Sequence, residues 1–166
     1  KLKVIQNVNE LMGTDAVVLP GVGSFSDGMD SLREKELVEA LLDAVVNQGK
    51  PTLGICLGMQ LLATTGSENG VRKGLDIISG SVIKLSIQDH KFRIPHIGWN
   101  EVEIAPNSKL YSGVENKSTF YFVHSYVLAT EDSSIVSGRC QHGKEFAASI
   151  ECDNVFATQF HPEKSQ

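Results

Sequence analysis

The stretch Thr52–Ala63, TLGICLGMQLLA, constrains the fold of this chain more than any other part of the sequence. A short apolar run, Thr52–Ile55, is followed by a run with helical spacing, Leu57–Ala63, and Cys56 lies between them with a glycine two residues away on either side. This spacing is typical of a nucleophile elbow, a tight turn from a strand into a helix. Only residues without a Cβ fit two positions before and after the nucleophile in such a turn. We therefore predict strand, turn and helix here, with Cys56 as a candidate nucleophile.

The predicted turn would give Cys56 two chemical advantages. The N–H groups that begin the following helix favour the thiolate, so we expect the thiol pKa below its usual value of about 8.5. The backbone N–H of Leu57 is expected to stabilise an oxyanion, an interaction worth on the order of 3 kcal/mol. A free cysteine at a strand end is also commonly a small buried apolar residue, so the elbow alone leaves both interpretations open.

Strands and helices are predicted to alternate in the first half of the chain. Ala16–Leu19 is typical of a short buried strand and leads into the loop Pro20–Gly23. Gly49–Pro51 ends the helix that follows. The apolar side chains of that helix recur with helical spacing at Val38, Leu41, Leu42, Val45 and Val46. The order strand, helix, strand, helix indicates a parallel sheet with right-handed crossovers.

The second half of the chain predicts strands, because β-branched and aromatic residues are grouped between turn residues. The expected strands are Ser79–Ile87, Asn100–Ala105, Thr119–Ala129, Ser133–Cys140, Glu145–Glu151 and Val155–Phe160. Asn69–Gly74 and Ser86–Lys91 are expected to be exposed loops. The fold class is therefore α/β, a mostly parallel sheet with flanking helices and an antiparallel extension.

Length and charge narrow the classes of partner. The 166 residues suffice for one domain, and the net charge of −5 argues against nucleic acid or an anionic membrane as the main partner. No apolar run reaches the roughly 18 residues that a membrane span needs. The three cysteines lack a metal-type C-x-x-C spacing, so we expect reduced thiols, no metal site and a cytoplasmic protein.

A candidate base for Cys56 lies in the segment FHPEKS near the end of the chain. Glu163 follows His161 by two positions, so both side chains point the same way from an extended backbone. A carboxylate beside an imidazole orients the ring and stabilises its cation. Because carboxyl ends of parallel strands commonly form α/β sites, we expect His161 and Glu163 to meet Cys56. The alternative is a strand-capping histidine and a solvated glutamate.

The remaining histidines and cysteines have simpler interpretations. His96 and His124 are more often structural than catalytic at such positions, and His90 and His142 are expected to be exposed. Cys140 and Cys152 flank a predicted hairpin and are interpreted as ordinary thiols.

The segments LPGVGSF, GICLGMQLL and FHPEKS, in this order, resemble the class I glutamine amidotransferase family, which has a flavodoxin-like sheet. PGVG, PHIGWN and YFVHSY are similar to motifs of one branch, the glutaminase subunits of imidazole glycerol phosphate synthase in histidine biosynthesis. The resemblance runs from about Asp15 to Ser165. The opening strand and helix of the family, and its closing helix, have no counterpart, so we expect residues 1–166 to form a single domain without its true ends.

The resemblance implies a role for each matching residue. Cys56 would be the nucleophile, His161 the base and acid, and Glu163 the orienting carboxylate. The other implied groups are an oxyanion hole of Gly21, Val22, Gly23 and Leu57, a glutamine site of Gly58, Gln60, Glu68, His124, Ser125 and Tyr126, and a partner face of Trp99, Asn100, Tyr121 and Lys164. Glu68 would face the substrate ammonium, although a solvated loop carboxylate is its common alternative. Packing in the core is the alternative for Trp99.

The resemblance further implies hydrolysis of L-glutamine through a cysteine thioester, without metal or cofactor. Ammonia would pass to a (β/α)₈ cyclase subunit in a heterodimer. Three alternatives stay open from the sequence. They are a paralogue that supplies ammonia to a surface-polysaccharide synthetase, a catalytically inactive binding module, and a cysteine peptidase on a similar frame.

Overall fold

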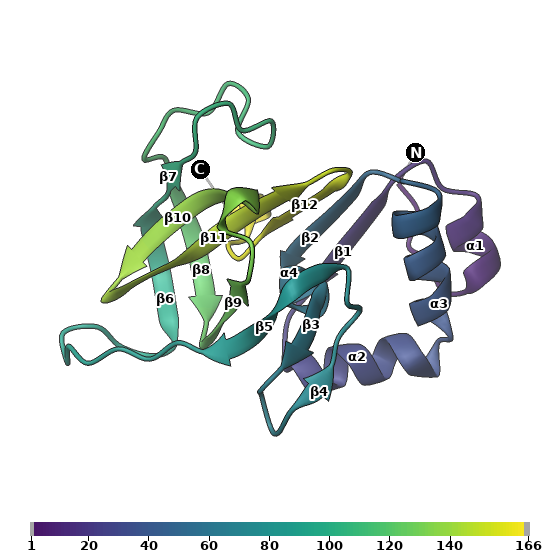
Figure 1. Cartoon of the computed structure of the whole chain (residues 1–166), viewed down its shortest axis with the longest axis horizontal. Helices are drawn as coiled ribbons and strands as arrows, with labels where there is room; N and C mark the ends of the chain where they lie inside the picture. The colour runs from purple at the N-terminus through teal and green to yellow at the C-terminus, as the bar shows by residue number, and fades with distance from the viewer. Residues whose placement is uncertain (1, 165–166) are drawn as a thin grey trace.

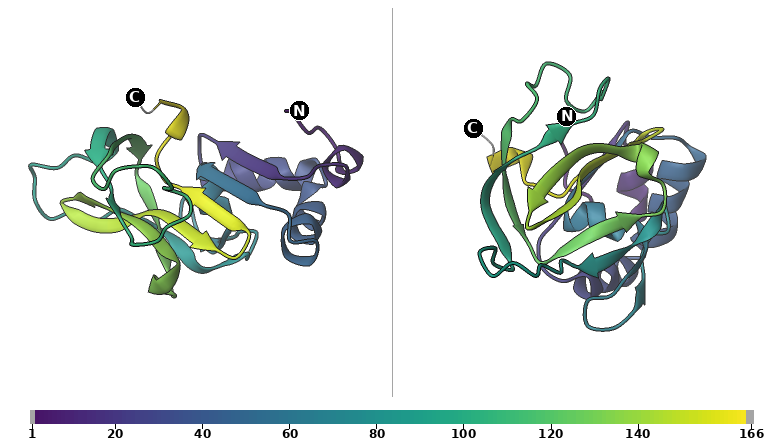
Figure 2. Two further views of the ribbon diagram at one scale, coloured as in Figure 1. Left: turned by 90° about the horizontal axis from the view of Figure 1, so that it is seen from above. Right: turned by 60° about the vertical axis from the view of Figure 1, so that its left-hand side comes forward.

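The structure, a computed structural model, describes residues 2–164. Helices α1–α3 gather at one end of the molecule and the strands of the second half gather at the other (Figures 1 and 2). The helical segments are α1 (Val8–Met12), α2 (Phe25–Glu34), α3 (Leu37–Leu42), the π-helical turn η1 (Asp43–Asn47), α4 (Leu57–Leu61), and the 3₁₀ turns η2 (Ser133–Ile135) and η3 (Pro162–Lys164).

The predicted strand–helix–strand–helix order of the first half is confirmed. Strand β1 (Val17–Gly21) pairs in parallel with β2 (Thr52–Cys56), and α4 follows β2 directly. Between the two strands, α2 was not predicted. Its Ser24 cap accepts a hydrogen bond from the Asp27 N–H, and its buried side chains are Phe25, Met29 and Leu32. The predicted helix Leu57–Ala63 ends early, because Ala63 already belongs to a strand.

The largest sheet is mixed rather than mostly parallel. Within the described residues it has the order β1-β2-β12-β11-β10-β7. Strands β1, β2 and β12 (Val155–Thr158) are parallel, whereas β11 (Lys144–Cys152), β10 (Val136–His142) and β7 (Glu103–Ile104) form the antiparallel extension that was predicted. The site described below lies where the parallel strands β2 and β12 end.

Two smaller sheets divide the remaining strands. One has the order β4-β3-β5-β9, from Arg72–Lys73, Ala63–Gly66, Ile78–Lys84 and Tyr126–Thr130. The other pairs β6 (His96–Glu101) with β8 (Thr119–His124). The single strand predicted for Thr119–Ala129 is therefore two strands that separate at Ser125, because β8 pairs with β6 and β9 pairs with β5. The predicted loop 69–74 contains the short strand β4.

The core is divided in the same way as the strands. One apolar cluster joins the helices to the parallel strands and includes Phe25, Met59 and Ile150. The other lies under the β6–β8 pair and includes Phe122 and Phe160. Phe160, which follows β12, packs in the second cluster while β12 itself packs in the first. The end of β12 therefore lies between the two halves of the molecule.

Candidate active site

The predicted elbow is present, and its backbone is strained at the cysteine. Cys56 has φ 53° and ψ −107°, a conformation that L-residues rarely adopt. Gly58 lies against β1, so that a Cβ at this position would stand 1.7 Å from the Leu19 carbonyl oxygen. A Cβ on Gly54 would stand 3.0 Å from backbone atoms of Gly58 and Met59. Both glycines are therefore required by contact between β1, β2 and α4.

The thiol pKa of Cys56 is raised, and the expectation of a lowered pKa is wrong. Burial raises it most, because the side chain is only 6% exposed and the charged thiolate loses hydration. The backbone N–H of Leu57 and the Gln159 side chain hydrogen-bond the sulfur and lower the pKa, and Glu163 raises it while Lys164 lowers it. Helix α4 has only five residues, so its dipole is small.

His161 and Glu163 form the predicted pair. The Nδ1 atom of His161 lies 2.8 Å from Oε1 of Glu163, which fixes the orientation of the ring. The His161 side chain is buried, and its backbone N–H donates to the Tyr121 carbonyl of β8. Burial raises the pKa of Glu163, but backbone and His161 hydrogen bonds oppose it, and the pKa is lowered overall. Glu163 is therefore an ionised partner for the imidazole at neutral pH.

Strand pairing brings this histidine segment to the elbow. Thr158 at the end of β12 is the parallel partner of Ile55, the residue before Cys56. Gln159, the next residue, places its Nε2 atom 3.8 Å from the Cys56 sulfur. Gln159 therefore meets Cys56 at this sheet edge from more than a hundred positions away in sequence, and His161 follows two positions later.

A cavity of about 300 Å³ opens beside the sulfur of Cys56. Of the residues predicted to surround glutamine or its oxyanion, eight line the cavity: Val22, Gly23, Leu57, Gln60, Glu68, His124, Ser125 and Tyr126. Pro95 and Val123 complete the wall. Gly21 and Gly58 are not among the lining residues. Gly21 is the strand partner of Cys56, and Gly58 packs against Leu19.

The side chains of Glu68 and Gln60, both predicted to contact the substrate, already make hydrogen bonds within the protein. The Oε2 atom of Glu68 accepts a 2.7 Å hydrogen bond from the backbone N–H of Phe25, the first residue of α2. The Nε2 atom of Gln60 donates to the carbonyl of Tyr126 and to Oε1 of Gln159, both at 3.0 Å. The cavity wall is therefore hydrogen-bonded to the start of α2 through Glu68 and to the segment that follows β12 through Gln60.

Three of the four residues predicted to face a partner share one surface. Trp99 is the strand partner of Tyr121, their rings make an edge contact, and the Lys164 ammonium lies 4.9 Å from the Tyr121 ring centre. Asn100 does not share this surface. Adjacent strand residues point to opposite faces, and the Nδ2 atom of Asn100 donates to the Gln141 carbonyl on β10.

Sequence reasoning missed the buried polar residue Gln159 near the cavity, whereas it had interpreted His96 and His124 as more often structural than catalytic. Gln159 is fully buried, and the only sequence signal is a polar residue inside the apolar segment that precedes His161. His96 and His124 are buried and hydrogen-bonded to each other, and burial lowers their pKa values to about 3 and about 4. His142, predicted to be exposed, is half-buried and stacks on His96 at 3.9 Å between ring centres.

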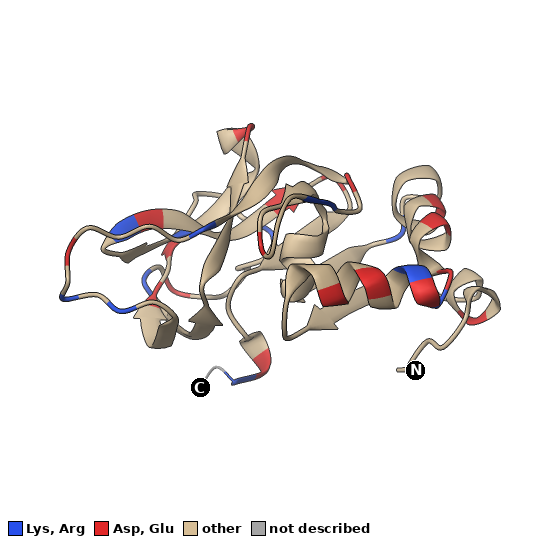
Figure 3. Ribbon diagram, turned by 90° about the horizontal axis from the view of Figure 1, so that it is seen from below, with Lys and Arg blue, Asp and Glu red and all other residues tan. Residues whose placement is uncertain are grey.

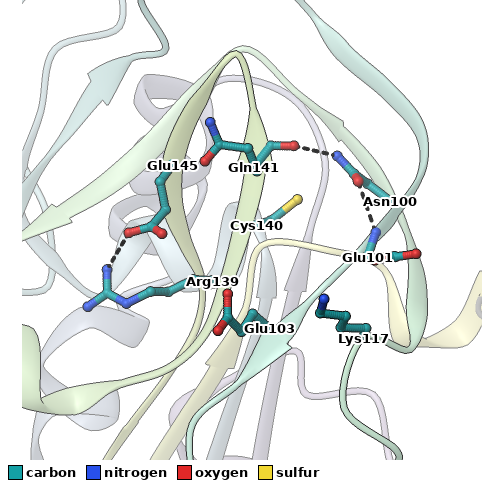
Figure 4. Close-up of a pocket in the computed structure, with 8 residues that line it drawn as sticks. All are labelled: Asn100, Glu101, Glu103, Lys117, Arg139, Cys140, Gln141 and Glu145. Carbon is teal, nitrogen blue, oxygen red and sulfur yellow. Dashed lines mark hydrogen bonds and ion pairs between the residues drawn. The ribbon is translucent and has the colours of Figure 1, made fainter.

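A second cavity, of about 350 Å³, is lined by residues of β6, β7, β10 and β11 (Figure 4). Its walls carry both charges, including Glu103, Lys117 and the ion pair between Arg139 and Glu145. The Cys140 thiol lies in this wall, and burial raises its pKa to about 12. This thiol is therefore protonated at neutral pH, in keeping with its interpretation as an ordinary one.

The distribution of charge, the helices and the potential metal ligands concern three other kinds of partner: nucleic acid, membranes and metal ions. In Figure 3, lysines and arginines are scattered among acidic residues, and α2 carries Asp27, Asp30 and Glu34 together with Arg33. No helix within residues 2–164 is long and apolar enough to cross a membrane. The same residues contain no group of three His, Cys, Asp or Glu side chains placed to hold a metal ion.

A cysteine on a strained strand-to-helix turn, and a histidine–carboxylate pair after the neighbouring parallel strand, are features that α/β proteins use for nucleophilic chemistry. The sequence model of the family "Glutamine amidotransferase class-I" matches residues 1–166, and the chain belongs to this family.

Curated relatives are similar over nearly the whole chain. "Imidazole glycerol phosphate synthase subunit HisH 1" of Campylobacter jejuni (strain RM1221) is 50% identical over 163 residues, covering 98% of this chain and 80% of the relative. "Imidazole glycerol phosphate synthase subunit HisH" of Pelagibacter ubique is 46% identical, with 99% and 79% covered. The protein of the same name from Methanocaldococcus jannaschii is 45% identical, with 99% and 81% covered.

Solved structures share the fold at lower identity. One titled "Crystal structure of glutamine amidotransferase" superimposes with a TM-score of 0.73 at 19% identity, over 97% of this chain and 77% of that one. The glutaminase domain of Trypanosoma brucei CTPS, solved with bound acivicin, gives a TM-score of 0.65 at 21% identity, over 94% and 66%. These similarities confirm the predicted fold class.

Proposed function

We propose that the chain is the glutaminase subunit of an imidazole glycerol phosphate synthase, hydrolysing L-glutamine to glutamate and ammonia for histidine biosynthesis in the cytoplasm. The observation that carries the proposal is the strained Cys56 elbow, open to a cavity and joined by strand pairing to the His161–Glu163 pair. Relatives at 42–50% identity that bear this subunit name support the branch of the family.

The proposed reaction uses the sulfur as a temporary acyl carrier. His161 takes the proton of Cys56, and the thiolate attacks the side-chain carbonyl carbon of glutamine. The Leu57 N–H and the loop Gly21–Gly23 would hold the oxyanion. When the C–N bond breaks, His161 returns the proton to the leaving ammonia. Water then hydrolyses the γ-glutamyl thioester, which releases glutamate and restores the thiol.

The raised thiol pKa of Cys56 gives His161 a necessary role in this scheme. Because burial keeps the free sulfur protonated, attack requires a base that accepts the proton as substrate arrives. The 2.8 Å contact between His161 Nδ1 and Glu163 would hold the ring and stabilise the imidazolium. Glu68, in the cavity wall, has the charge to attract the substrate ammonium.

The proposed partner surface lies next to the mouth of the cavity. Ile97, Trp99 and Val123 are 61%, 46% and 36% exposed, and they project with Tyr121 from the same side of the β6–β8 pair. Val123 also lines the cavity. Ammonia must remain unprotonated to react, so a partner that covers this mouth would give it a dry exit. We propose that a (β/α)₈ cyclase subunit binds here.

The experiment compares two nitrogen sources in the complex with the cyclase. Cys56→Ala is expected to abolish glutamine-dependent synthesis and to leave ammonia-dependent synthesis unchanged, while the control Cys152→Ala retains both. Equal loss of both activities in Cys56→Ala would contradict the role as ammonia donor. Binding of a sugar-modifying synthetase in place of the cyclase would instead support the surface-polysaccharide alternative.

A further inference from the structure

A series of buried side-chain hydrogen bonds leads to the sulfur of Cys56. Gln159 is fully buried, and its Nε2 atom donates to Cys56 Sγ at 3.8 Å. Its Oε1 atom accepts from Gln60 Nε2 at 3.0 Å. Gln60 uses its second amide hydrogen to donate to the Tyr126 carbonyl, also at 3.0 Å. The series therefore runs from a main-chain oxygen in the cavity wall to the sulfur.

The direction of these hydrogen bonds is fixed by the main-chain carbonyl. A carbonyl only accepts, so Gln60 must direct its NH₂ group toward Tyr126. The other hydrogen of the Gln60 NH₂ group then points to Gln159, so Gln159 must present its side-chain oxygen as the acceptor. Gln159 is thereby left with its NH₂ group toward Cys56. Reversal of Gln60 would bring its oxygen against the Tyr126 carbonyl, which places two acceptors together. Reversal of Gln159 would bring its NH₂ group against that of Gln60, which places two donors together. Either contact is costly in a buried site.

The Tyr126 carbonyl is itself held from a second side. His124 Nδ1 lies 3.0 Å from it and must carry the hydrogen, because the carbonyl only accepts. His124 Nε2 then accepts from His96 Nδ1 at 3.1 Å, and His96 Nε2 faces the amide of Asn100 at 3.4 Å. The same amide group donates to the carbonyl of Gln141 (Figure 4).

We propose that Gln159 is a positioning residue for the nucleophile, held by Gln60 in the one amide orientation that presents an N–H to the Cys56 sulfur. The inference rests on the proposed function for its catalytic consequence, but not for its geometry. The N–H holds the sulfur at the elbow and stabilises negative charge as the proton leaves for His161. It offsets part of the burial penalty on the thiolate, because a hydrogen bond to a charged acceptor is stronger than one to a neutral acceptor.

The test uses two substitutions at Gln159 and one control elsewhere. Gln159→Met keeps the length of the side chain without a donor, and Gln159→Glu keeps nearly the same shape with a carboxylate in place of the amide. The control Tyr111→Phe removes a buried hydrogen bond to Ser149 in the other core cluster, which is a similar loss of stability away from the elbow. Iodoacetamide is the probe, with alkylation of Cys56 followed by peptide mass spectrometry from pH 6 to pH 10.

Both Gln159 variants are expected to move the alkylation midpoint of Cys56 to higher pH, Gln159→Glu the further. Alkylation at pH 7 should slow by about threefold to tenfold in Gln159→Met, the equivalent of one lost hydrogen bond. The control should keep the wild-type midpoint. In the complex with the cyclase, kcat for glutamine should fall by a similar factor with little change in KM.

An unchanged midpoint in a folded Gln159 variant would overturn the proposal, and so would the same shift in Tyr111→Phe. If Gln159→Met does not fold, the nearly isosteric Gln159→Glu tests the proposal through its own alkylation midpoint. Alkylation needs neither glutamine nor the cyclase. A wild-type protein without glutaminase activity would therefore refute the proposed function, while the alkylation midpoints would still test Gln159.

Discussion

Gly58 lies so close to β1 that the elbow leaves no space for a side chain. Because a Cβ would overlap the Leu19 carbonyl oxygen at 1.7 Å, Gly58→Ala must push α4 away from β1. We expect a loss of about 3 kcal/mol or more in the free energy of unfolding, together with loss of glutaminase activity. Urea denaturation and an assay with the cyclase measure the two effects.

Gly13→Ala is the matched control for this substitution. Gly13 has φ −83°, and its Cβ would stand 3.9 Å from the Glu10 carbonyl, an ordinary contact. We expect its unfolding free energy to stay within about 0.5 kcal/mol of the wild type. A Gly58→Ala protein as stable as Gly13→Ala would show that the close approach of α4 to β1 is not needed.

For individual residues, the sequence predicted the geometry of the reactive side chains better than the pKa of Cys56. The spacing around Cys56 and the pair His161–Glu163 are local patterns, and both have the predicted form. The raised pKa of Cys56 depends on how deeply the sulfur is buried by other segments. Gln159 was missed for the same reason, since its partners Gln60 and Cys56 lie about a hundred positions away.

Among the secondary-structure elements, errors arose where pairing partners are distant in sequence. The strands of the first half and the antiparallel extension follow local patterns. The break at Ser125 does not, because it exists only where β8 and β9 join different sheets. Helix α2, in contrast, could have been predicted from local sequence patterns. Its apolar residues Phe25, Met29 and Leu32 have helical spacing, and Ser24 is a typical N-cap.

The β6–β8 pair offers a prediction about the partner surface. Trp99 is 46% exposed at the centre of the outward side, and large aromatic residues of this kind dominate binding energies. We expect Trp99→Ala to weaken binding of the cyclase by about 2 kcal/mol, which titration calorimetry measures. The control is Val46→Ala, an apolar residue that is 62% exposed on η1, at the helical end of the molecule. Equal affinities for the two variants would remove this surface from the proposal.

For the whole molecule, the buried histidines predict how stability depends on pH. Burial lowers the pKa of His96 to about 3 and of His124 to about 4, from 6.5. Between pH 7 and pH 5 the unfolded chain therefore binds protons that the native protein excludes, and the native state loses stability as the pH falls. The directions of the hydrogen bonds lead to the same expectation. Protonation of His124 Nε2 would place two N–H donors against each other at its contact with His96.

The expected loss approaches about 1.4 kcal/mol per pH unit for each histidine once the pH is below 6.5. Urea denaturation at pH 7, 6 and 5 measures it, above the range where most carboxylates titrate. His124→Asn should be less stable at pH 7 but should show a shallower decline, because one of the excluded protons is no longer bound by the unfolded chain. His90→Asn, which changes an exposed histidine, should keep the wild-type slope. A wild-type protein equally stable at all three pH values would mean that the His96–His124 pair accepts protons in the native state, and that the fixed hydrogen-bond directions leading to Tyr126 and Gln60 do not hold.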